Sequence, residues 1–362
     1  MFILEDELEP HSHLCDLLRL QLLQSIAIVR LLMKRWYEPA DIKQLHLSTL
    51  VHQILSVIAQ WGGVRVEQLW TLLCATGPFT QVSINCFKQL LRQMSEEKLI
   101  FQLNDGQLVL GENGERFTGH YTFYAVFKTP EEYRIEHNGK TLGSLPIESP
   151  VSVNQNIIFA GRRWKVAQVD LEKKVIRVSK AKGGEPPYFF GGGISVHNEV
   201  RKEMFRIYND GEYKIKTGNA RIEYLDSNAR KLFQEGRDFF KNSGLDKTPF
   251  FAHGDTLYIV PWLGDKIINT LFTILVGRGL KLTKFSGIIE IQETNETEIR
   301  SIFDEILTGP QQPVEELTKL VTEKKTEKFD HFLSEQLLCK TYAAKVFDMD
   351  GAYKWIGKLH NY

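Results

Sequence analysis

The segment Leu99-Ile-Phe-Gln-Leu-Asn-Asp-Gly-Gln-Leu-Val-Leu110 joins two short apolar runs through the sequence Asn-Asp-Gly. An Asp-Gly pair readily adopts the positive φ angles that a tight turn between antiparallel strands requires. The segment therefore predicts a β-hairpin whose turn lies at residues 104–106.

Three helices are predicted ahead of this hairpin, over residues 48–60, 64–74 and 83–98. Ser48 fits the N-cap of the first helix, and Gly62-Gly63 fits its end. Apolar side chains recur on one face of the third helix, at Ile84, Phe87, Leu90, Leu91 and Met94. Three helices followed by a hairpin are the parts of a winged helix, which is a variant of the helix-turn-helix.

The third helix of such a domain can enter the major groove of DNA. Here it would present Lys88 and Arg92, and these are candidate phosphate contacts. Residues 43–116 as a whole hold six basic and six acidic residues, so their charge does not favour DNA. A structural or protein-binding role for this domain therefore stays open.

A basic strip follows in Phe159-Ala-Gly-Arg-Arg-Trp-Lys-Val-Ala-Gln-Val-Asp170, where Arg162, Arg163 and Lys165 surround Trp164. Arg177 lies on a second basic strand, and residues 158–182 carry eight Lys/Arg against two Asp/Glu. Short β runs with turn signals, including one at 122–127, predict a small antiparallel β-barrel over this region.

Cations beside an aromatic ring can hold a nucleic-acid backbone and stack one base. In the alternative interpretation, Trp164 packs in a core and the basic side chains are only solvated. A loop rich in Gly and Pro, residues 180–195, then precedes His197 at the start of a predicted helix. Amides at such a helix start can hold a phosphate, although a plain loop and a structural histidine explain the same residues.

The remaining segments are helical or mixed. Residues 14–36 are apolar on more than one face, which predicts a helix buried against the rest of the chain or against a missing partner. Residues 218–361 alternate predicted helices with short strands. We therefore expect an α+β protein in four parts: an N-terminal helical segment (1–42), a winged helix (43–118), a β-barrel with a Gly/Pro-rich loop (119–210) and an α+β C-terminal domain (211–362).

Composition excludes some classes of protein and site. The 362 residues contain 45 Lys+Arg and 45 Asp+Glu, so the net charge gives no global signal for nucleic acid. The four cysteines form no CxxC pair, and the spacing of His11, His13 and Cys15 is too loose to predict a metal site. No signal peptide or membrane span is expected, so a cytoplasmic protein is the default.

The motif search finds no catalytic centre. Asn138-Gly-Lys-Thr141 has the end of a phosphate-binding loop, but Arg134 stands where that motif requires glycine. The stretch also lies between two predicted strands, as a hairpin turn does. No acidic magnesium-binding box and no Ser-His-Asp, Cys-His or paired-carboxylate set can be assembled. We therefore expect no ATPase motor, no catalytic residue, no cofactor and no metal in this chain.

The order of several short motifs resembles a known family: Gly111-Glu-Asn-Gly-Glu-Arg116, Phe123-Tyr-Ala-Val-Phe127, Leu142-Gly-Ser-Leu-Pro-Ile147, Phe159-Ala-Gly-Arg-Arg-Trp164 and Val196-His-Asn-Glu-Val-Arg201. The chain resembles the region that follows the two RecA lobes in Lhr-like superfamily 2 helicases, which are ATP-dependent DEAD/DEAH-box enzymes. The resemblance covers nearly the whole chain and is most specific over residues 38–208. Residues 1–10 look like the tail of the second RecA lobe.

The resemblance implies that a winged helix and a barrel-containing domain form a track for a single strand. The RecA lobes themselves are absent, so ATPase activity is not implied for this chain. The expected function is that of a nucleic-acid-binding accessory region, whose partners are single-stranded DNA or RNA and a separately encoded RecA-type motor. Two alternatives remain. One is a protein-interaction scaffold that docks the motor, and the other is a DNA-base glycosylase, since some Lhr proteins carry a C-terminal uracil-DNA glycosylase activity.

Overall fold

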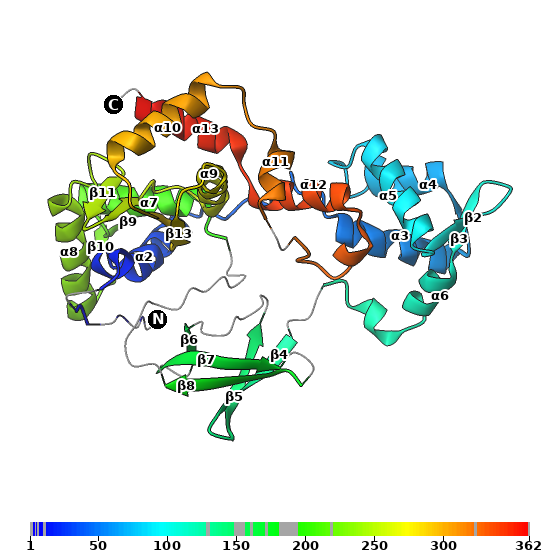
Figure 1. Ribbon diagram of the computed structural model, residues 1–362, viewed down its shortest axis with the longest axis horizontal. Coiled ribbons are helices and arrows are strands. Elements are labelled where there is room, and N and C mark those ends of the chain that lie inside the picture. Colours follow the sequence, from blue (N-terminus) through cyan, green and yellow to red (C-terminus); the bar gives the residue numbers. More distant parts are fainter. Residues whose placement is uncertain are drawn as a thin grey trace.

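The computed structural model describes residues 3, 5, 7–9, 12–127, 131–147, 156–159, 162–170, 173–180, 195–217, 220–321 and 324–360. The fold is mixed α+β, with four small sheets that are all open within this described part (Figure 1). This confirms the expected class.

The first lobe contains the predicted hairpin and helices. Its strands pair in the order β1-β3-β2, all antiparallel, and Ile100 lies opposite Leu110 as the hairpin prediction requires. Gly62, with a φ of 75°, ends the first helix. The elements are α3 (Leu47–Trp61), β1 (Val64–Arg65), α4 (Val66–Trp70), the π-helical turn η1 (Thr71–Ala75), α5 (Ile84–Glu96), β2 (Ile100–Gln102), β3 (Gln107–Leu110) and α6 (Glu112–Thr118).

Two local predictions in this lobe are wrong. The N-cap of α3 is His46, and the Ser48 hydroxyl instead accepts the backbone N–H of Phe329 at 2.9 Å. Residues 64–65 pair with β3 as a strand before the second helix begins. Both differences arise because distant segments, the 329 region and β3, supply hydrogen-bond partners that local sequence cannot reveal.

A C-terminal segment completes the core of this lobe. Phe329 and Leu337 are almost fully buried in the same cluster as Leu50 and Leu90. In Figure 1 helix α12 correspondingly lies beside the lobe of α3 and α5. The core therefore crosses the expected boundary between the second and the fourth part of the chain. The segment consists of α11 (Val314–Lys319), the 3-10 turn η3 (Asp330–Phe332) and α12 (Glu335–Val346).

Five strands form a separate sheet in the order β5-β4-β8-β7-β6. Strands β4 and β8 run parallel while the other neighbours are antiparallel, so the sheet is mixed and not purely antiparallel as expected. Within the described residues its edges, β5 and β6, do not close into a barrel. Asn138 and Gly139, both with positive φ, make the predicted turn between β4 and β5. The strands are β4 (Glu131–His137), β5 (Lys140–Ile147), β6 (Asn156–Phe159), β7 (Arg162–Asp170) and β8 (Val175–Lys180).

The N-terminal apolar segment is two helices, α1 (Leu14–Leu17) and α2 (Leu20–Met33), which are separated by Arg19 at a φ of 45°. Helix α2 buries leucine and isoleucine side chains against α7 (Asn198–Asp210) and α8 (Ser227–Asn242). The first of the two alternatives therefore holds: the segment is buried against the rest of the chain.

The remaining α+β part is built around a four-stranded antiparallel sheet in the order β11-β12-β14-β13. Side chains alternate between its faces, so Ile288 joins the core of α2 and α7 whereas Ile289 joins the core of α9 and α10. The elements are β9 (Ile215–Thr217), β10 (Ala220–Ile222), β11 (Phe250–His253), β12 (Thr256–Ile259), α9 (Asp265–Gly277), β13 (Leu282–Phe285), β14 (Ile288–Gln292), α10 (Glu296–Thr308) and α13 (Met349–His360).

Candidate nucleic-acid interface

Helix α5 presents two cations on its outer face. Ser83 caps the helix by accepting the backbone N–H of Cys86, and Phe87 and Leu90 turn inward to the core. Lys88 and Arg92 lie one turn apart and are exposed. Within the described residues no carboxylate lies at ion-pair distance from either of them. Their charges are therefore available to a phosphate backbone.

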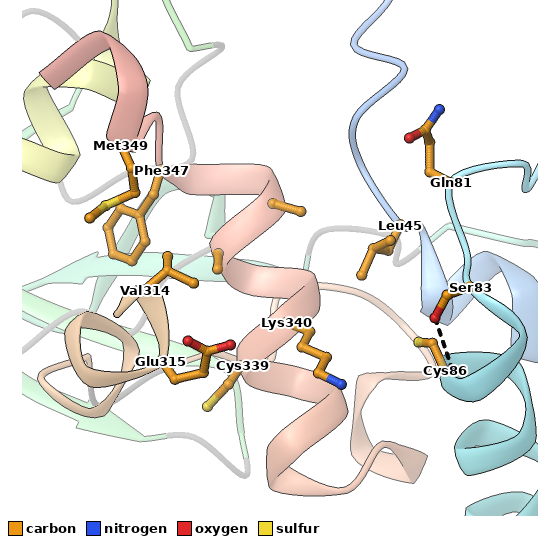
Figure 2. Close-up of a pocket in the computed structure, with 12 residues that line it drawn as sticks. Leu45, Gln81, Ser83, Cys86, Val314, Glu315, Cys339, Lys340, Phe347 and Met349 are labelled. Atoms are coloured by element: carbon orange, nitrogen blue, oxygen red, sulfur yellow. Dashed lines mark hydrogen bonds between the residues drawn. The ribbon is translucent and has the colours of Figure 1, made fainter. Parts of the chain in front are cut away.

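A hollow of about 470 Å³ adjoins the start of α5 (Figure 2). Cys86 and Ser83 line one side, and Lys340 and Cys339 of α12 line the other. Burial raises the pKa of the Cys86 thiol, and the charge of Lys340 opposes this only in part. A protonated, buried thiol is a poor nucleophile, so Cys86 is not placed to attack a substrate in this hollow.

Trp164 of β7 lies in the core of the five-stranded sheet. Its side chain is 4% exposed among Ile135, Val166 and Val178, and the ring of His137 lies 4.9 Å away, centroid to centroid. A ring buried in this way cannot stack a base, which favours the packing interpretation of this residue.

The opposite face of the same sheet is polar and basic. Alternation along β7 turns Lys165 away from the core, and this side chain is exposed. Arg177 of β8 is half exposed, donates to the Gln168 side chain at 2.8 Å and lies 3.8 Å from Glu136. Arg162 and Arg163 pair through their backbones with Phe159 and Ile158, and their side chains lie outside the described part. The structure thus brings Lys165 and Arg177 onto adjacent strands.

The charge of this sheet is strongly positive. Its five strands with their described turns contain nine Lys/Arg and four Asp/Glu. Trp164 thus packs inside the sheet, while Lys165 and Arg177 lie on its exposed face.

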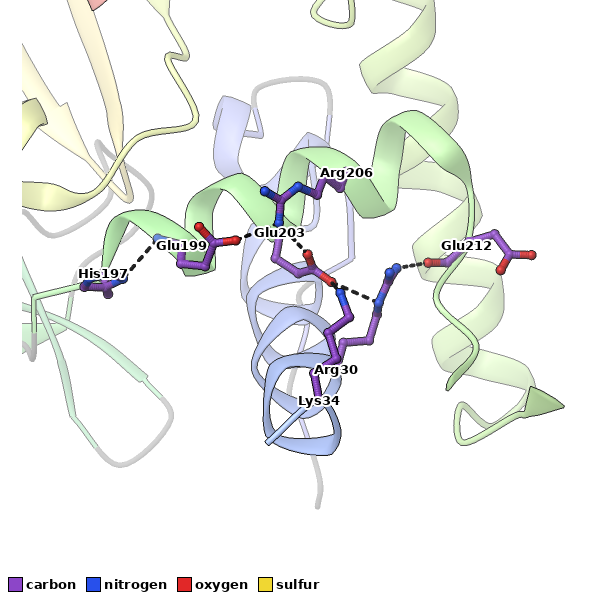
Figure 3. Close-up of polar contacts among 7 residues, drawn as sticks. All are labelled: Arg30, Lys34, His197, Glu199, Glu203, Arg206 and Glu212. Atoms are coloured by element: carbon purple, nitrogen blue, oxygen red, sulfur yellow. Dashed lines mark hydrogen bonds and ion pairs between the residues drawn. The ribbon is translucent and has the colours of Figure 1, made fainter. Parts of the chain in front are cut away.

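His197 has a structural role. Its Nδ1 accepts the backbone N–H of Glu199 at 3.0 Å and so caps α7 (Figure 3). The centroid of its ring lies 5.3 Å from that of Trp36. The capping nitrogen is already engaged, so it does not hold a phosphate in this arrangement. The Gly-rich residues 181–194 lie outside the described part of the chain.

Figure 3 also shows the ion-pair cluster that joins α2 to α7. The Glu203 carboxylate is fully buried and contacts Lys34 at 2.7 Å, Arg30 at 3.1 Å and Arg206 at 3.1 Å. Burial alone would raise the pKa of Glu203, but hydrogen bonds from Lys34 and Arg206, with the charge of Arg30, hold it below its usual value. An acid that stays ionised and fully paired stabilises the fold and is not a proton donor.

Sequence reasoning missed a set of exposed aromatic residues between α6 and β4. Tyr121, Tyr124 and Phe127 are 77%, 85% and 78% exposed. The predicted strand at 122–127 is wrong, because residues 121–124 form a 3-10 helix, η2 (Tyr121–Tyr124). The signal in the sequence was the spacing of three residues between Tyr121, Tyr124 and Phe127. This spacing matches the three residues per turn of a 3-10 helix, whereas side chains on one face of a strand recur every two residues.

Comparisons of this chain with protein-family models, with curated proteins and with solved structures find no match. In the residues that the structure describes, no cluster of three or more His, Cys, Asp or Glu is arranged to bind a metal. No described helix is both long enough and apolar enough to cross a membrane.

Proposed function

We propose that this chain is a nucleic-acid-binding accessory region of the Lhr-like helicase type, which grips a single strand and has no ATPase activity of its own. In this proposal residues 43–118 act as a winged helix, and β4–β8 belong to the barrel-containing domain. The order α3-β1-α4-α5-β2-β3 supports the first assignment, because a winged helix uses the same order of elements. A separately encoded RecA-type motor would supply ATP hydrolysis.

The observation that carries the proposal is the pair of exposed cations on each of two elements, α5 and the five-stranded sheet. Phosphate contacts of this kind give affinity without base specificity. They therefore suit a region that holds any sequence while a motor moves along the strand. DNA and RNA both offer this backbone.

A second candidate function is that of a protein-interaction scaffold that docks the motor. Apolar residues of α2 that lie on the surface favour it. Ile28, Leu32 and Met33 are 47%, 55% and 51% exposed, although the opposite face of the helix is buried. An exposed apolar stripe is typical of a protein-contact surface. The two functions are compatible, since one chain could hold a strand and a motor at the same time.

Fluorescence anisotropy with labelled single-stranded DNA and RNA, at about 50 and about 200 mM salt, tests the proposal. The logarithm of affinity falls as the logarithm of salt concentration rises, and each lost phosphate contact reduces the magnitude of this negative slope by about 0.7 for single strands. One double variant is Lys88→Ala plus Arg92→Ala, and the other is Lys165→Ala plus Arg177→Ala. We expect each double variant to reduce the magnitude of the slope by about 1.4.

Lys281→Ala is the matched control, because this lysine is also exposed (69%) but lies beside β13 in another part of the fold. It should leave the slope unchanged. The proposal fails if the wild-type chain binds neither nucleic acid, or if both double variants keep the wild-type slope. Capture of a RecA-type motor without nucleic-acid binding would select the scaffold.

A further inference from the structure

The short helix η2 is fixed to the first lobe by its central residue. Phe123 is 9% exposed, and its ring stacks on that of His52 with 4.4 Å between centroids. The His52 Nε2–H donates to the Phe123 carbonyl at 2.9 Å. The neighbouring rings of Tyr121 and Tyr124 have no such burial and lie in solvent. Two exposed rings therefore stand on a firmly held backbone.

The geometry of a 3-10 helix places these two tyrosines on one side. Residues three apart eclipse one another, and a rise of about 2.0 Å per residue separates them by about 6 Å along the axis. A base inserted between two rings needs two stacking intervals of about 3.4 Å each, or about 6.8 Å. The ideal axial separation of two residues three apart in such a helix is therefore close to the value that one inserted base needs.

Phe127 continues the aromatic row in the direction of the five-stranded sheet. It is 78% exposed and lies four positions before Glu131, the first residue of β4. In the sequence, these rings thus lie between the helix that carries Lys88 and the strand that carries Lys165, the two parts of the proposed phosphate-binding surface.

A cation lies beside the row. The Lys328 ammonium donates to the backbone carbonyls of Thr122 and Ala125, on either side of Tyr124. Among the described residues no carboxylate pairs with it. Exposed rings with an adjacent unneutralised cation are the combination by which proteins bind single strands without sequence preference.

We propose that Tyr121, Tyr124 and Phe127 form a base-stacking row for single-stranded nucleic acid, with Lys328 next to the phosphate backbone. The inference rests on the proposed function and adds to it the means of selecting single strands, because paired bases do not offer their faces to a ring. The excess of positive charge on the five-stranded sheet, together with Lys328 beside the rings, favours a nucleic acid over a protein as the occupant.

The test uses a single-stranded oligonucleotide that contains 2-aminopurine, whose fluorescence is quenched by stacking, and a duplex of the same sequence. Tyr121→Ala plus Tyr124→Ala leaves only Phe127 of the three rings, so it should strongly reduce the quenching and weaken single-strand binding by about fivefold or more per ring removed. Duplex affinity and the salt slope should not change, because no phosphate contact is removed.

Two controls accompany this pair. Tyr121→Phe plus Tyr124→Phe keeps both rings and should bind and quench like the wild type. Tyr37→Ala removes an equally exposed ring (71%) from another part of the chain and should have no effect. Thermal melting should be unchanged in all variants, because the side chains are exposed. The single variant Tyr124→Ala measures separately how much one ring contributes to quenching and to single-strand affinity.

The outcomes separate this inference from the proposed function. If the alanine pair retains quenching and affinity while the lysine and arginine variants lower the salt slope, the stacking row is wrong and the proposed function stands. Equal loss of single-strand and duplex binding would also overturn the row. If the wild-type chain binds no nucleic acid, the proposed function itself falls, and a protein partner becomes the occupant to seek.

Discussion

Removal of the Glu203 carboxylate should loosen the N-terminal helix from the rest of the protein. Glu203 lies on α7, and two of its three partners are Arg30 of α2 and Lys34, the C-cap residue of α2. Replacement by alanine leaves these cations facing a site that water does not reach, since the Glu203 side chain is 0% exposed. The structure indicates how large the penalty should be.

Only the most buried partner contributes strongly to this penalty. Lys34 and Arg206 are 52% and 50% exposed and can turn to solvent, whereas the Arg30 side chain is 16% exposed and cannot do so easily. Breaking a buried ion pair by removing one partner costs about 3–5 kcal/mol. With one such partner, we expect Glu203→Ala to cost about 3 kcal/mol.

Glu199→Ala is the matched control on the same helix. Glu199 is 29% exposed and pairs only with the half-exposed Arg206, so its loss should cost less than about 1 kcal/mol. Hydrogen–deuterium exchange of the α2 amides measures both effects locally. A Glu203→Ala variant whose α2 exchanges as slowly as that of Glu199→Ala would refute the reasoning.

The same carboxylate predicts a pH dependence with a definite sign. The pKa of Glu203 is lowered in the folded protein from its ordinary value of 4.5. A lowered pKa contributes stability that is complete above the unfolded value and is lost as the pH falls through the folded one. In the wild type, the protection of the α2 amides against hydrogen exchange should therefore decline below about pH 4.5. In Glu203→Ala this protection should depend less on pH.

Three further predictions concern other parts of the fold. Burial lowers the pKa of His52, so the first lobe should lose stability as the pH falls below 6.5, and thermal melting of His52→Gln should show a smaller pH dependence. Gly236→Ala would place a Cβ 2.2 Å from the Tyr208 hydroxyl and should cost about 1–3 kcal/mol in chemical denaturation, whereas Gly357→Ala would place a Cβ at an ordinary contact distance of 4.0 Å from Leu307 and should be neutral or stabilising. Trp164→Ala should cost about 3–5 kcal/mol and expose the five-stranded sheet to proteolysis, while Lys165→Ala should leave it intact; equal resistance of the two variants would contradict the placement of the ring.

Local patterns predicted much of the secondary structure in this chain. The Asp-Gly turn between residues 99–103 and 107–110, the helix at 83–98 and the turn at Asn138-Gly139 all hold. Each depends on interactions between residues close in sequence, such as positive φ at glycine or the Ser83 cap. Such signals are readable because the groups that satisfy them are near neighbours.

The candidate interface was predictable only in part. Lys88, Arg92, Lys165 and Arg177 were found from their charge, and the structure leaves them all at least half exposed or on the surface. The aromatic row was missed, since Phe123 and not its neighbours enters the core, through contacts with His52 and Phe329. Contacts of Phe123 with two segments far away in the sequence, at His52 and Phe329, therefore decide which rings face solvent.

By itself, the sequence determined the mixed class, most helices and hairpins, the lack of a phosphate-binding loop and the location of the basic strip. Tertiary structure alone decided that Trp164 points inward and Lys165 outward, that β4 and β8 pair in parallel, and that residues 329–338 complete the core of the first lobe. The physical reason is the same in each case. Strand partners and core contacts form between distant segments, and the burial that they create is a property of the assembled chain and not of any local pattern.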